Sequence, residues 1–354
     1  MKDRFNLDSH KFYYHPEAIY DFVHDKPAKP IYVEISPTAY CNHRCVFCHY
    51  NYLGHQGRFE DSNRLLSLID EVKNVGAKSV VFAGTGEPLL NKHTIPSIVY
   101  AKSIGLDVGM STNGALLKTD DFEALAKALT WIRFSFNATD AQTYAHIHQT
   151  KAEDFENVLH NIEQLVEAKK RLGASITIGV QFILLPDNHA FLETLVQRLK
   201  AIGVDYFVIK QFYKHSKNRF QIKEAFPTEA VMKSLMELSL MYNDATFNLI
   251  VRSPQVLEED RKYTQCYGLP YILYIREDGN LFTCFSFQHD EKTILGNIFE
   301  HSLESVWCSK QKEEALHYIN TCIDKNRCQP SCRHHHINNY LWELKHPSSH
   351  INFI

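Results

Sequence analysis

The sequence predicts an α/β fold in which parallel strands form a partial (β/α)6 barrel, followed by a smaller cysteine-rich domain. Six apolar runs with the character of strands are separated by segments whose apolar residues recur at helical spacing. Repeated strand–helix units of this kind require a parallel sheet with crossover connections. Six of the nine cysteines lie beyond residue 265, after the last of these units. We therefore expect a barrel over residues 31–217, a helical connector over 218–258 and a second domain over 259–354.

The composition is that of an ordinary soluble protein. The 354 residues are 44% hydrophobic and 22% charged, and the formal net charge of −3 gives no reason to expect a nucleic-acid partner. Residues 1–30 are polar and rich in histidine, so we expect a leader segment there and not a signal peptide. No apolar run reaches the ~18 residues that a membrane span needs. Nine cysteines in ligand-like groups, without an export signal, predict reduced thiols and a cytoplasmic location.

The expected elements alternate along the first two thirds of the chain. The expected strands cover residues 31–36, 78–84, 106–110, 131–137, 175–184 and 206–212, and the expected helices cover residues 62–74, 95–104, 121–129, 153–172 and 190–202. Functional groups in βα barrels gather at the carboxyl ends of the strands. The polar residues that follow these strands are therefore the candidates for a site.

Three cysteines lie close together directly after the first strand. They are Cys41, Cys45 and Cys48, within the sequence Tyr-Cys-Asn-His-Arg-Cys-Val-Phe-Cys-His-Tyr. Three thiolates can hold three corners of an iron–sulfur cube that usually takes four cysteines, so one iron would stay open to another ligand. A structural zinc site is the alternative, with His43 or His49 as the fourth ligand.

The spacing of these cysteines, with Phe47 just before the last of them, resembles the radical S-adenosylmethionine (SAM) superfamily. Residues 84–88 (Gly-Thr-Gly-Glu-Pro) match, with Thr in the second place, the Gly-Gly-Glu-Pro stretch that follows the second strand in that superfamily. The resemblance implies a 4Fe-4S cluster with an open iron on the three cysteines. It also implies that the methionyl amino group of SAM binds at Gly84, Thr85, Gly86 and Glu87. An ordinary strand-to-helix turn is the alternative reading of residues 84–88.

Polar residues at the ends of later strands match superfamily positions that contact the ribose and carboxylate of SAM. The candidates for contact with this cofactor are Ser111, Asn113, Ser135, Lys151 and Gln181. The superfamily often has a basic residue after the fourth strand for the SAM carboxylate. Here His148 and Lys151 are the candidates, because the expected arginine is absent from that region. Lys210 in the sixth strand either contacts substrate or extends to the rim of the barrel.

The second cysteine-rich region resembles the SPASM/twitch extension found after many radical SAM barrels. The resemblance implies auxiliary 4Fe-4S clusters held by a β-hairpin and a cysteine-rich tail. The dipeptide Asp278-Gly279 predicts the hairpin turn between residues 271–275 and 281–285. This chain departs from the full pattern, because Ile319 occupies the place of one tail cysteine and no cysteine follows Cys332. We therefore expect a single auxiliary cluster.

The cysteines of this region supply more than one possible ligand set. Cys266, Cys284 and Cys332 match the first auxiliary site of the extension, and the fourth ligand is Cys328 or Cys322, or less readily a histidine from 334–336. A zinc ribbon is the alternative. Cys308 lies outside both sets and is expected to be a small buried residue or, alternatively, a hydrogen-atom donor.

The resemblance implies an enzyme in which Cys41, Cys45 and Cys48 support reductive cleavage of SAM. The resulting 5′-deoxyadenosyl radical would take a hydrogen atom from a substrate, with a flavodoxin or ferredoxin as reductant. Peptide-modifying relatives usually carry an N-terminal domain of ~80 residues, but only 30 residues precede the first strand here.

These expectations favour a small polar metabolite as substrate, such as a sugar, an aminocyclitol or a nucleotide sugar. The outcome would be oxidation, epimerisation or bond formation. One alternative is a maturase that modifies a peptide or protein. Another is a non-catalytic iron–sulfur electron carrier, which would leave residues 84–88 and 111–114 without a role.

Overall fold

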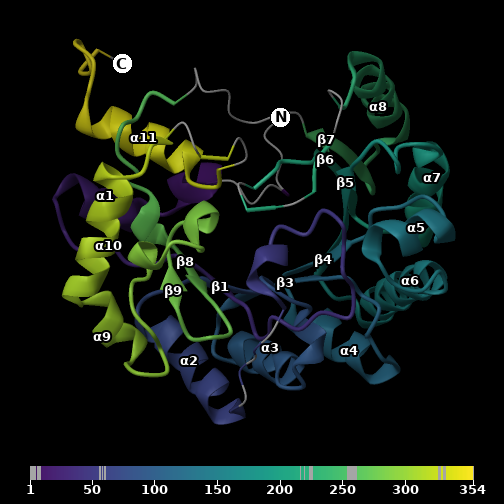
Figure 1. Cartoon of the computed structure of the whole chain (residues 1–354), viewed down its shortest axis with the longest axis horizontal. Helices are drawn as coiled ribbons and strands as arrows, with labels where there is room; N and C mark the ends of the chain where they lie inside the picture. The colour runs from purple at the N-terminus through teal and green to yellow at the C-terminus, as the bar shows by residue number, and fades with distance from the viewer. Residues whose placement is uncertain are drawn as a thin grey trace.

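One continuous sheet runs through the described part of the chain (Figure 1). The structure is a computed structural model that describes residues 5, 9–55, 57, 59, 61–215, 217–218, 220–222, 226–252, 261–325, 328–329 and 332–353. Within these residues the sheet has nine strands in the order β7-β6-β5-β4-β3-β2-β1-β8-β9. Strands β1 to β7 pair in parallel with their neighbours, as successive strand–helix units require.

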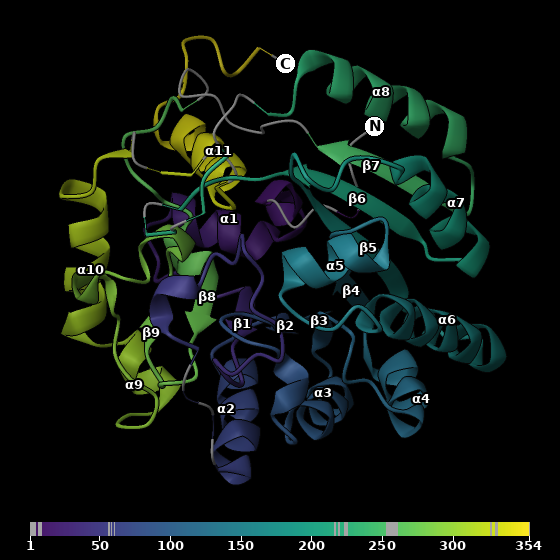
Figure 2. The ribbon, with the colours of Figure 1, turned by 45° about the vertical axis from the view of Figure 1, so that its right-hand side comes forward.

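The strands curl into an open partial barrel, which confirms the predicted α/β fold (Figure 2). Their bounds are β1 Tyr32–Ile35, β2 Ser79–Phe82, β3 Asp107–Thr112, β4 Trp131–Ser135, β5 Thr177–Leu184, β6 Tyr206–Gln211, β7 Asn248–Arg252, β8 Ile272–Ile275 and β9 Leu281–Phe282. The six strands expected from the sequence correspond to β1 to β6.

Strand β7 lies in the segment that was expected to be a helical connector. It pairs in parallel with β6, with Lys210 opposite Arg252, and adds a seventh strand to the barrel. The expectation of six strands and of helix throughout residues 218–258 was therefore wrong within the described residues. The strand is short and follows helix α8 (Glu229–Tyr242) closely, so the helical spacing of α8 dominates the pattern of the whole segment. Residues 253–258 of this prediction lie outside the described residues.

Helices α2, α3, α4, α6 and α7 form a curved layer on the outer face of the barrel strands (Figure 2). The bounds of all the helices are α1 Pro16–Val23, α2 Ser62–Asn74, α3 Thr94–Ser103, α4 Thr119–Ala128, α5 Ala141–His148, α6 Asp154–Leu172, α7 Leu192–Ile202, α8 Glu229–Tyr242, α9 Leu303–Trp307, α10 Lys310–Thr321 and α11 His335–Lys345. In chain order, α2, α3, α4, α6 and α7 each contact the next. Among the described residues there is no helix with the length and hydropathy of a membrane span.

Strand β4 shows how the sheet separates core from site. Ile132 and Phe134 are fully buried in the apolar core that also contains residues of the outer helices. The alternate residues Trp131, Arg133 and Ser135 are only partly buried and line cavities. Because side chains alternate between the faces of a strand, the inner face of the barrel is free to carry polar groups.

The C-terminal region is attached directly to the barrel sheet. Strand β8 pairs in parallel with β1, and the predicted hairpin is confirmed by the antiparallel pair β8 and β9. Gly279 has φ +82° at its turn, a conformation that glycine adopts readily. The N-terminal segment packs beneath this region, where Phe12, Tyr271, Ile337 and Leu341 form a small apolar cluster. The expected leader is therefore part of the folded structure over its described residues.

Candidate active site

One cavity collects nearly all the predicted cofactor contacts at the carboxyl ends of the strands. It has a volume of about 290 Å³. The predicted residues that line it are Cys41, Cys45, Phe47, Cys48, Gly84, Thr85, Gly86, Glu87, Ser111, Asn113, Ser135 and Gln181. Lys151 is exposed and is not among the lining residues, so the structure does not bring this candidate to the site.

The three-cysteine loop is held in place by the end of helix α5. The backbone N–H groups of Arg44 and Val46 donate to the carbonyl groups of His148 and Ile147, at 2.9 Å in both cases. Helix α5 was not predicted; it begins after Asp140, whose carboxylate accepts from the N–H groups of two residues of its first turn.

Burial and mutual repulsion affect the thiols of this loop. Burial, with smaller contributions from Glu87 and Cys48, raises the pKa of Cys41 to about 12. Burial also raises the pKa of Cys45 well above its usual value, with Cys48 and Cys41 as further causes. Thiols that disfavour each other's ionisation in a buried site are stabilised as thiolates by a metal centre. This donor set therefore fits an iron–sulfur cluster.

His148 is positioned by hydrogen bonds on both ring nitrogens. Its Nε2 lies 3.1 Å from the backbone N of Asn137, which can only donate, so Nε2 is the acceptor. Burial, with a smaller effect of His43, holds the pKa of His148 well below its usual value, so the ring is neutral. The proton then resides on Nδ1, which lies 3.3 Å from the sulfur of Cys45 and donates to it. Both ring nitrogens of His148 are therefore used in hydrogen bonds to Cys45 and Asn137, and His148 was a candidate for contact with the SAM carboxylate.

Glu87 sits between the cysteine loop and the end of β3. Its carboxylate accepts hydrogen bonds from the hydroxyl group of Thr112 at 2.6 Å and from the backbone N–H groups of Asn113 and Leu89. Burial raises the pKa of this carboxyl above its usual value, and these three hydrogen bonds to the charged form limit the rise. A carboxylate fixed in this way can accept an ammonium group of a ligand without rearranging.

The glycines of residues 84–88 allow β2 to end tightly against the cysteine loop. A Cβ atom on Gly86 would lie 2.3 Å from the carbonyl oxygen of Tyr40, so a side chain does not fit there. Thr85, which replaces a glycine of the superfamily pattern, donates to the carboxylate of Glu277 at 2.5 Å. It also forms a 2.6 Å hydrogen bond with Ser36. The departure from the pattern therefore links the barrel to the hairpin region.

Two arginines in the barrel interior were not predicted as site residues. Arg133 lies opposite Ser111 in the register of β3 and β4 and donates to its hydroxyl group at 3.1 Å. Arg333 forms an ion pair with Glu34, with 2.7 Å between nitrogen and oxygen. The alternation of β4 was the available signal for Arg133, because it shares a face with Ser135. Arg333 had no such signal, since it follows Cys332 in a loop.

Four thiols of the C-terminal region influence one another. After burial, the largest causes of the raised pKa of Cys284 are Cys332, Cys328 and Cys266. Burial and Cys332 raise the pKa of Cys266 to about 12, and burial and Cys328 raise that of Cys332 to about 11. Cys322 is exposed and is not among these causes. The geometry therefore favours Cys328 as the fourth member of the set.

Cys308 was expected to be buried, and this expectation was wrong. It is exposed at the end of α9, whose buried face consists of Leu303, Val306 and Trp307. Cys308 follows the last residue of α9, on the side of this short helix that faces away from the core. It does not line the cavity of the cysteine loop.

Comparison with known proteins identifies both regions. Residues 35–184 match the family model of the radical SAM superfamily, and residues 266–334 match that of an iron–sulfur cluster-binding domain, SPASM. The chain belongs to the radical SAM superfamily. The radical SAM domain implies a 4Fe-4S cluster and SAM as cofactors. The C-terminal SPASM domain implies auxiliary iron–sulfur binding.

Curated relatives of this radical SAM protein cover most of its length. A tungsten-containing aldehyde ferredoxin oxidoreductase cofactor-modifying protein of Pyrococcus furiosus is 24% identical, over 86% of each chain. A probable GTP 3′,8-cyclase of Sulfurisphaera tokodaii is 26% identical, over 74% of this chain and 83% of that one.

Solved structures share the fold of this radical SAM protein. SuiB of Streptococcus suis bound to SAM superposes with a TM-score of 0.66 at 17% identity, covering 95% of this chain and 79% of SuiB. The protein anSMEcpe with bound AdoMet gives a TM-score of 0.61 at 14% identity, covering 90% of this chain and 97% of that one. At such identities the likeness concerns the fold alone.

Proposed function

We propose that this radical SAM enzyme acts on a small polar metabolite, such as a sugar, an aminocyclitol or a nucleotide sugar. The outcome would be oxidation, epimerisation or bond formation. The observation that carries the proposal is the convergence of the cysteine loop, Glu87 and the polar strand ends on one cavity of about 290 Å³. When bound, the cluster supplies one electron to SAM, whose C5′–S bond breaks to give methionine and the 5′-deoxyadenosyl radical that takes a hydrogen atom from substrate.

Cys41, Cys45 and Cys48 would hold the cluster through three thiolates. Among the described residues that line the cavity, there is no fourth cysteine. An iron without a protein ligand is what a cluster needs in order to bind a cosubstrate. Arg44, whose guanidinium donates to the carbonyl groups of Cys41 and His43, keeps the loop folded around this position.

The residues around the cysteine loop would bind and orient SAM. Glu87 supplies a carboxylate for the methionyl ammonium group, next to the backbone of residues 84–86. Ser111, Ser135 and Gln181 lie on three neighbouring strands and present polar groups to the same cavity. The side-chain oxygen of Gln181 is buried and has no hydrogen-bond partner within the described structure, so it is available to a donor on the ligand.

Cys266, Cys284, Cys328 and Cys332 would hold one auxiliary cluster. Four thiolates complete the protein ligation of a 4Fe-4S cluster, so such a site favours electron transfer over direct binding of substrate. His49 follows Cys48 of the first site, and Phe285 follows Cys284 of the second. Their ring centroids lie 4.7 Å apart, so the two sites are in contact through these side chains. A small flavodoxin-like or ferredoxin-like reductant would serve as electron donor.

The names of two curated relatives support a small-molecule substrate. The two curated relatives that match most of the chain carry names that refer to a cofactor and to GTP. The second candidate is a peptide or protein substrate, favoured by the fold of SuiB, which has also been solved with its precursor peptide SuiA and superposes with a TM-score of 0.66.

A direct assay tests the enzyme class against a passive electron carrier. Protein reconstituted with iron and sulfide is incubated with SAM and dithionite, and 5′-deoxyadenosine is measured. We expect 5′-deoxyadenosine and about eight iron atoms per chain, the content of two 4Fe-4S clusters. Absence of 5′-deoxyadenosine would contradict the proposed activity, and about four iron atoms would contradict the auxiliary cluster.

A further inference from the structure

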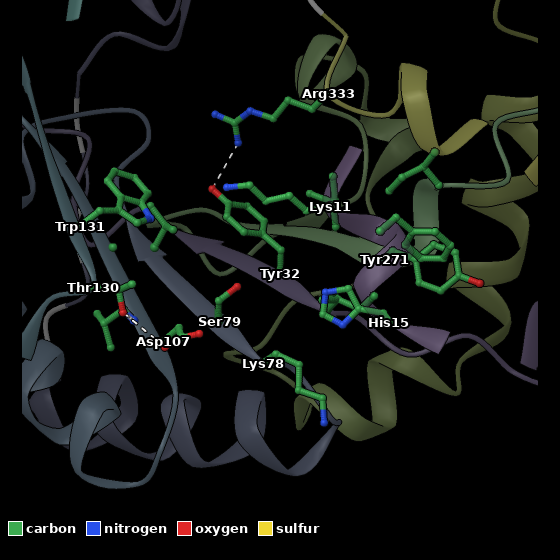
Figure 3. A pocket seen from close by; sticks show the side chains of 17 residues that line it. Lys11, His15, Tyr32, Lys78, Ser79, Asp107, Thr130, Trp131, Tyr271 and Arg333 are labelled. Atoms are coloured by element: carbon green, nitrogen blue, oxygen red, sulfur yellow. Dashed lines mark hydrogen bonds between the residues drawn. The ribbon is translucent and has the colours of Figure 1, made fainter. Parts of the chain in front are cut away.

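A second cavity lies at the amino ends of the strands, and some residues line both it and the cofactor cavity. The second cavity has a volume of about 310 Å³ and is shown in Figure 3. The residues that line both cavities are Tyr32, Val81, Trp131 and Arg333. The two cavities therefore share part of their walls, and Arg133 lines the cofactor cavity but not this second one.

Arg133 is a partly buried cation without an acidic partner in the described structure, and its guanidinium carbon lies 5.6 Å from the centre of the Trp131 ring. Its Nε is buried and makes no hydrogen bond, and its only hydrogen bond in the described structure is the one to Ser111. No carboxylate within the described residues forms an ion pair with it, in contrast to Arg333 with Glu34. Burial lowers the pKa of Arg133, and Arg333 and Arg252 lower it further. An unpaired buried charge is destabilising, so an anion that completes this site would bind favourably.

The surroundings of Arg133 add further positive charge. Arg133 also lines a third cavity of about 310 Å³, together with Lys11, Trp131 and Tyr206. Lys11 belongs to the 3-10 helix η1 (Ser9–Tyr14) and lines the second cavity as well (Figure 3). The N-terminal segment thus contributes a cation to the amino end of the barrel.

Arg133 lies below the carboxyl end of β4 and lines both the cofactor cavity and the third cavity. Arg133 precedes Ser135 by two residues on β4, so it lies roughly 7 Å farther from the carboxyl end of the strand. The cysteine loop and Glu87, which would hold the amino-acid part of SAM, are at that carboxyl end. Arg133 therefore borders the cofactor cavity, where it donates to Ser111, and also the third cavity, which lies nearer the amino ends of the strands.

We infer that Arg133 binds a phosphate group of the substrate in the third cavity, which Lys11 also lines. This inference rests on the proposed small-metabolite function and narrows the substrate to a phosphate-bearing molecule, such as a sugar phosphate or a nucleotide. A planar guanidinium presents paired N–H donors that match phosphate oxygens. The carbon skeleton of the substrate would extend from this group toward the cofactor cavity.

Calorimetric titration of the reconstituted protein, saturated with SAM, tests this inference with inorganic pyrophosphate as the probe. We expect R133Q to bind pyrophosphate at least about 10-fold more weakly than the unmodified protein, the loss typical of a charge-assisted hydrogen bond. R133K is expected to have an intermediate affinity for pyrophosphate, because lysine keeps the positive charge but lacks the paired N–H donors of the guanidinium. R171Q is the control, because Arg171 is largely exposed and lies on the outer helix α6. Iron content and circular dichroism check that each variant is folded.

Three outcomes would overturn the inference. The first is equal pyrophosphate affinity in R133Q and the unmodified protein, or no binding in either. The second is a loss of SAM affinity in R133Q with pyrophosphate binding unchanged, which would assign Arg133 to SAM. The third is equally tight binding of malonate, which would assign a carboxylate. Production of 5′-deoxyadenosine is measured in parallel, because a protein that cleaves SAM without binding pyrophosphate refutes the phosphate site alone.

Discussion

The two thiol sites of this protein are assembled in opposite ways. The first takes its three cysteines from one stretch of eight residues, Cys41 to Cys48. The second takes its four from separate segments, namely the approach to β8, the end of the β8–β9 hairpin and the tail before α11. A single short loop leaves one side of its site open to a cavity, whereas several converging segments supply a complete ligand set.

The two sites also differ in the groups that surround them. The first site borders a ligand cavity and receives a hydrogen bond from His148 on one sulfur. The second is held by Arg261, whose guanidinium donates to the carbonyl groups of Lys325, Cys328 and Gln329. Both sites have an arginine on their backbone carbonyl groups, Arg44 at the first and Arg261 at the second, so the cavity and the His148 hydrogen bond are what set the first site apart.

Removal of a thiol from the open site should have the largest effect. We expect C45A to abolish formation of 5′-deoxyadenosine and to lower the iron content by about four atoms per chain, since two thiolates do not retain the cube. The matched control is C308A, because Cys308 is exposed and belongs to neither set. Retained cleavage of SAM by C45A would show that the loop is not the reaction centre.

Removal of a thiol from the closed site should have a partial effect. We expect C328A to lower the iron content, by at most about four atoms per chain since three thiolates remain, and to keep some cleavage of SAM, because the two clusters are bound at separate sites. C322A is the control, because Cys322 is exposed. If C322A loses iron and C328A does not, the ligand assignment is reversed.

Loss of the His148 hydrogen bond should change the open site without removing its cluster. A donor to a ligating sulfur stabilises the reduced, more negative state, so H148F is expected to lower the reduction potential by roughly 50 mV. An EPR-monitored redox titration measures this shift. H146F is the control, because His146 is exposed on the same helix. An unchanged potential in H148F would remove His148 from the tuning of this site.

The contact between the two regions should have the smallest effect. Replacement of Thr85 by Gly restores the superfamily pattern but leaves the buried carboxyl of Glu277 without this donor. We expect the free energy of unfolding to fall by about 1–3 kcal/mol, measured by denaturant titration. T85S keeps the hydroxyl group and is expected to retain most of the stability. Equal stability of T85G and the unmodified protein would argue against this link.

Local patterns were sufficient for the parts of the molecule that depend on neighbouring residues. The strand–helix alternation predicted β1 to β6, and the Asp278-Gly279 dipeptide predicted the hairpin. The same patterns were insufficient where an edge strand is short, as for β7, or where exposure depends on which side of a helix faces the core, as for Cys308.

The sequence by itself determined the barrel, the three-cysteine loop and the glycine-rich turn, because each depends on residues that lie close together along the chain. Only the tertiary structure placed Arg133 inside the barrel, turned His148 toward Cys45 and favoured Cys328 over Cys322. These features depend on contacts between residues far apart in sequence. No local spacing encodes such contacts, because they arise when the sheet curls and the C-terminal domain packs against it.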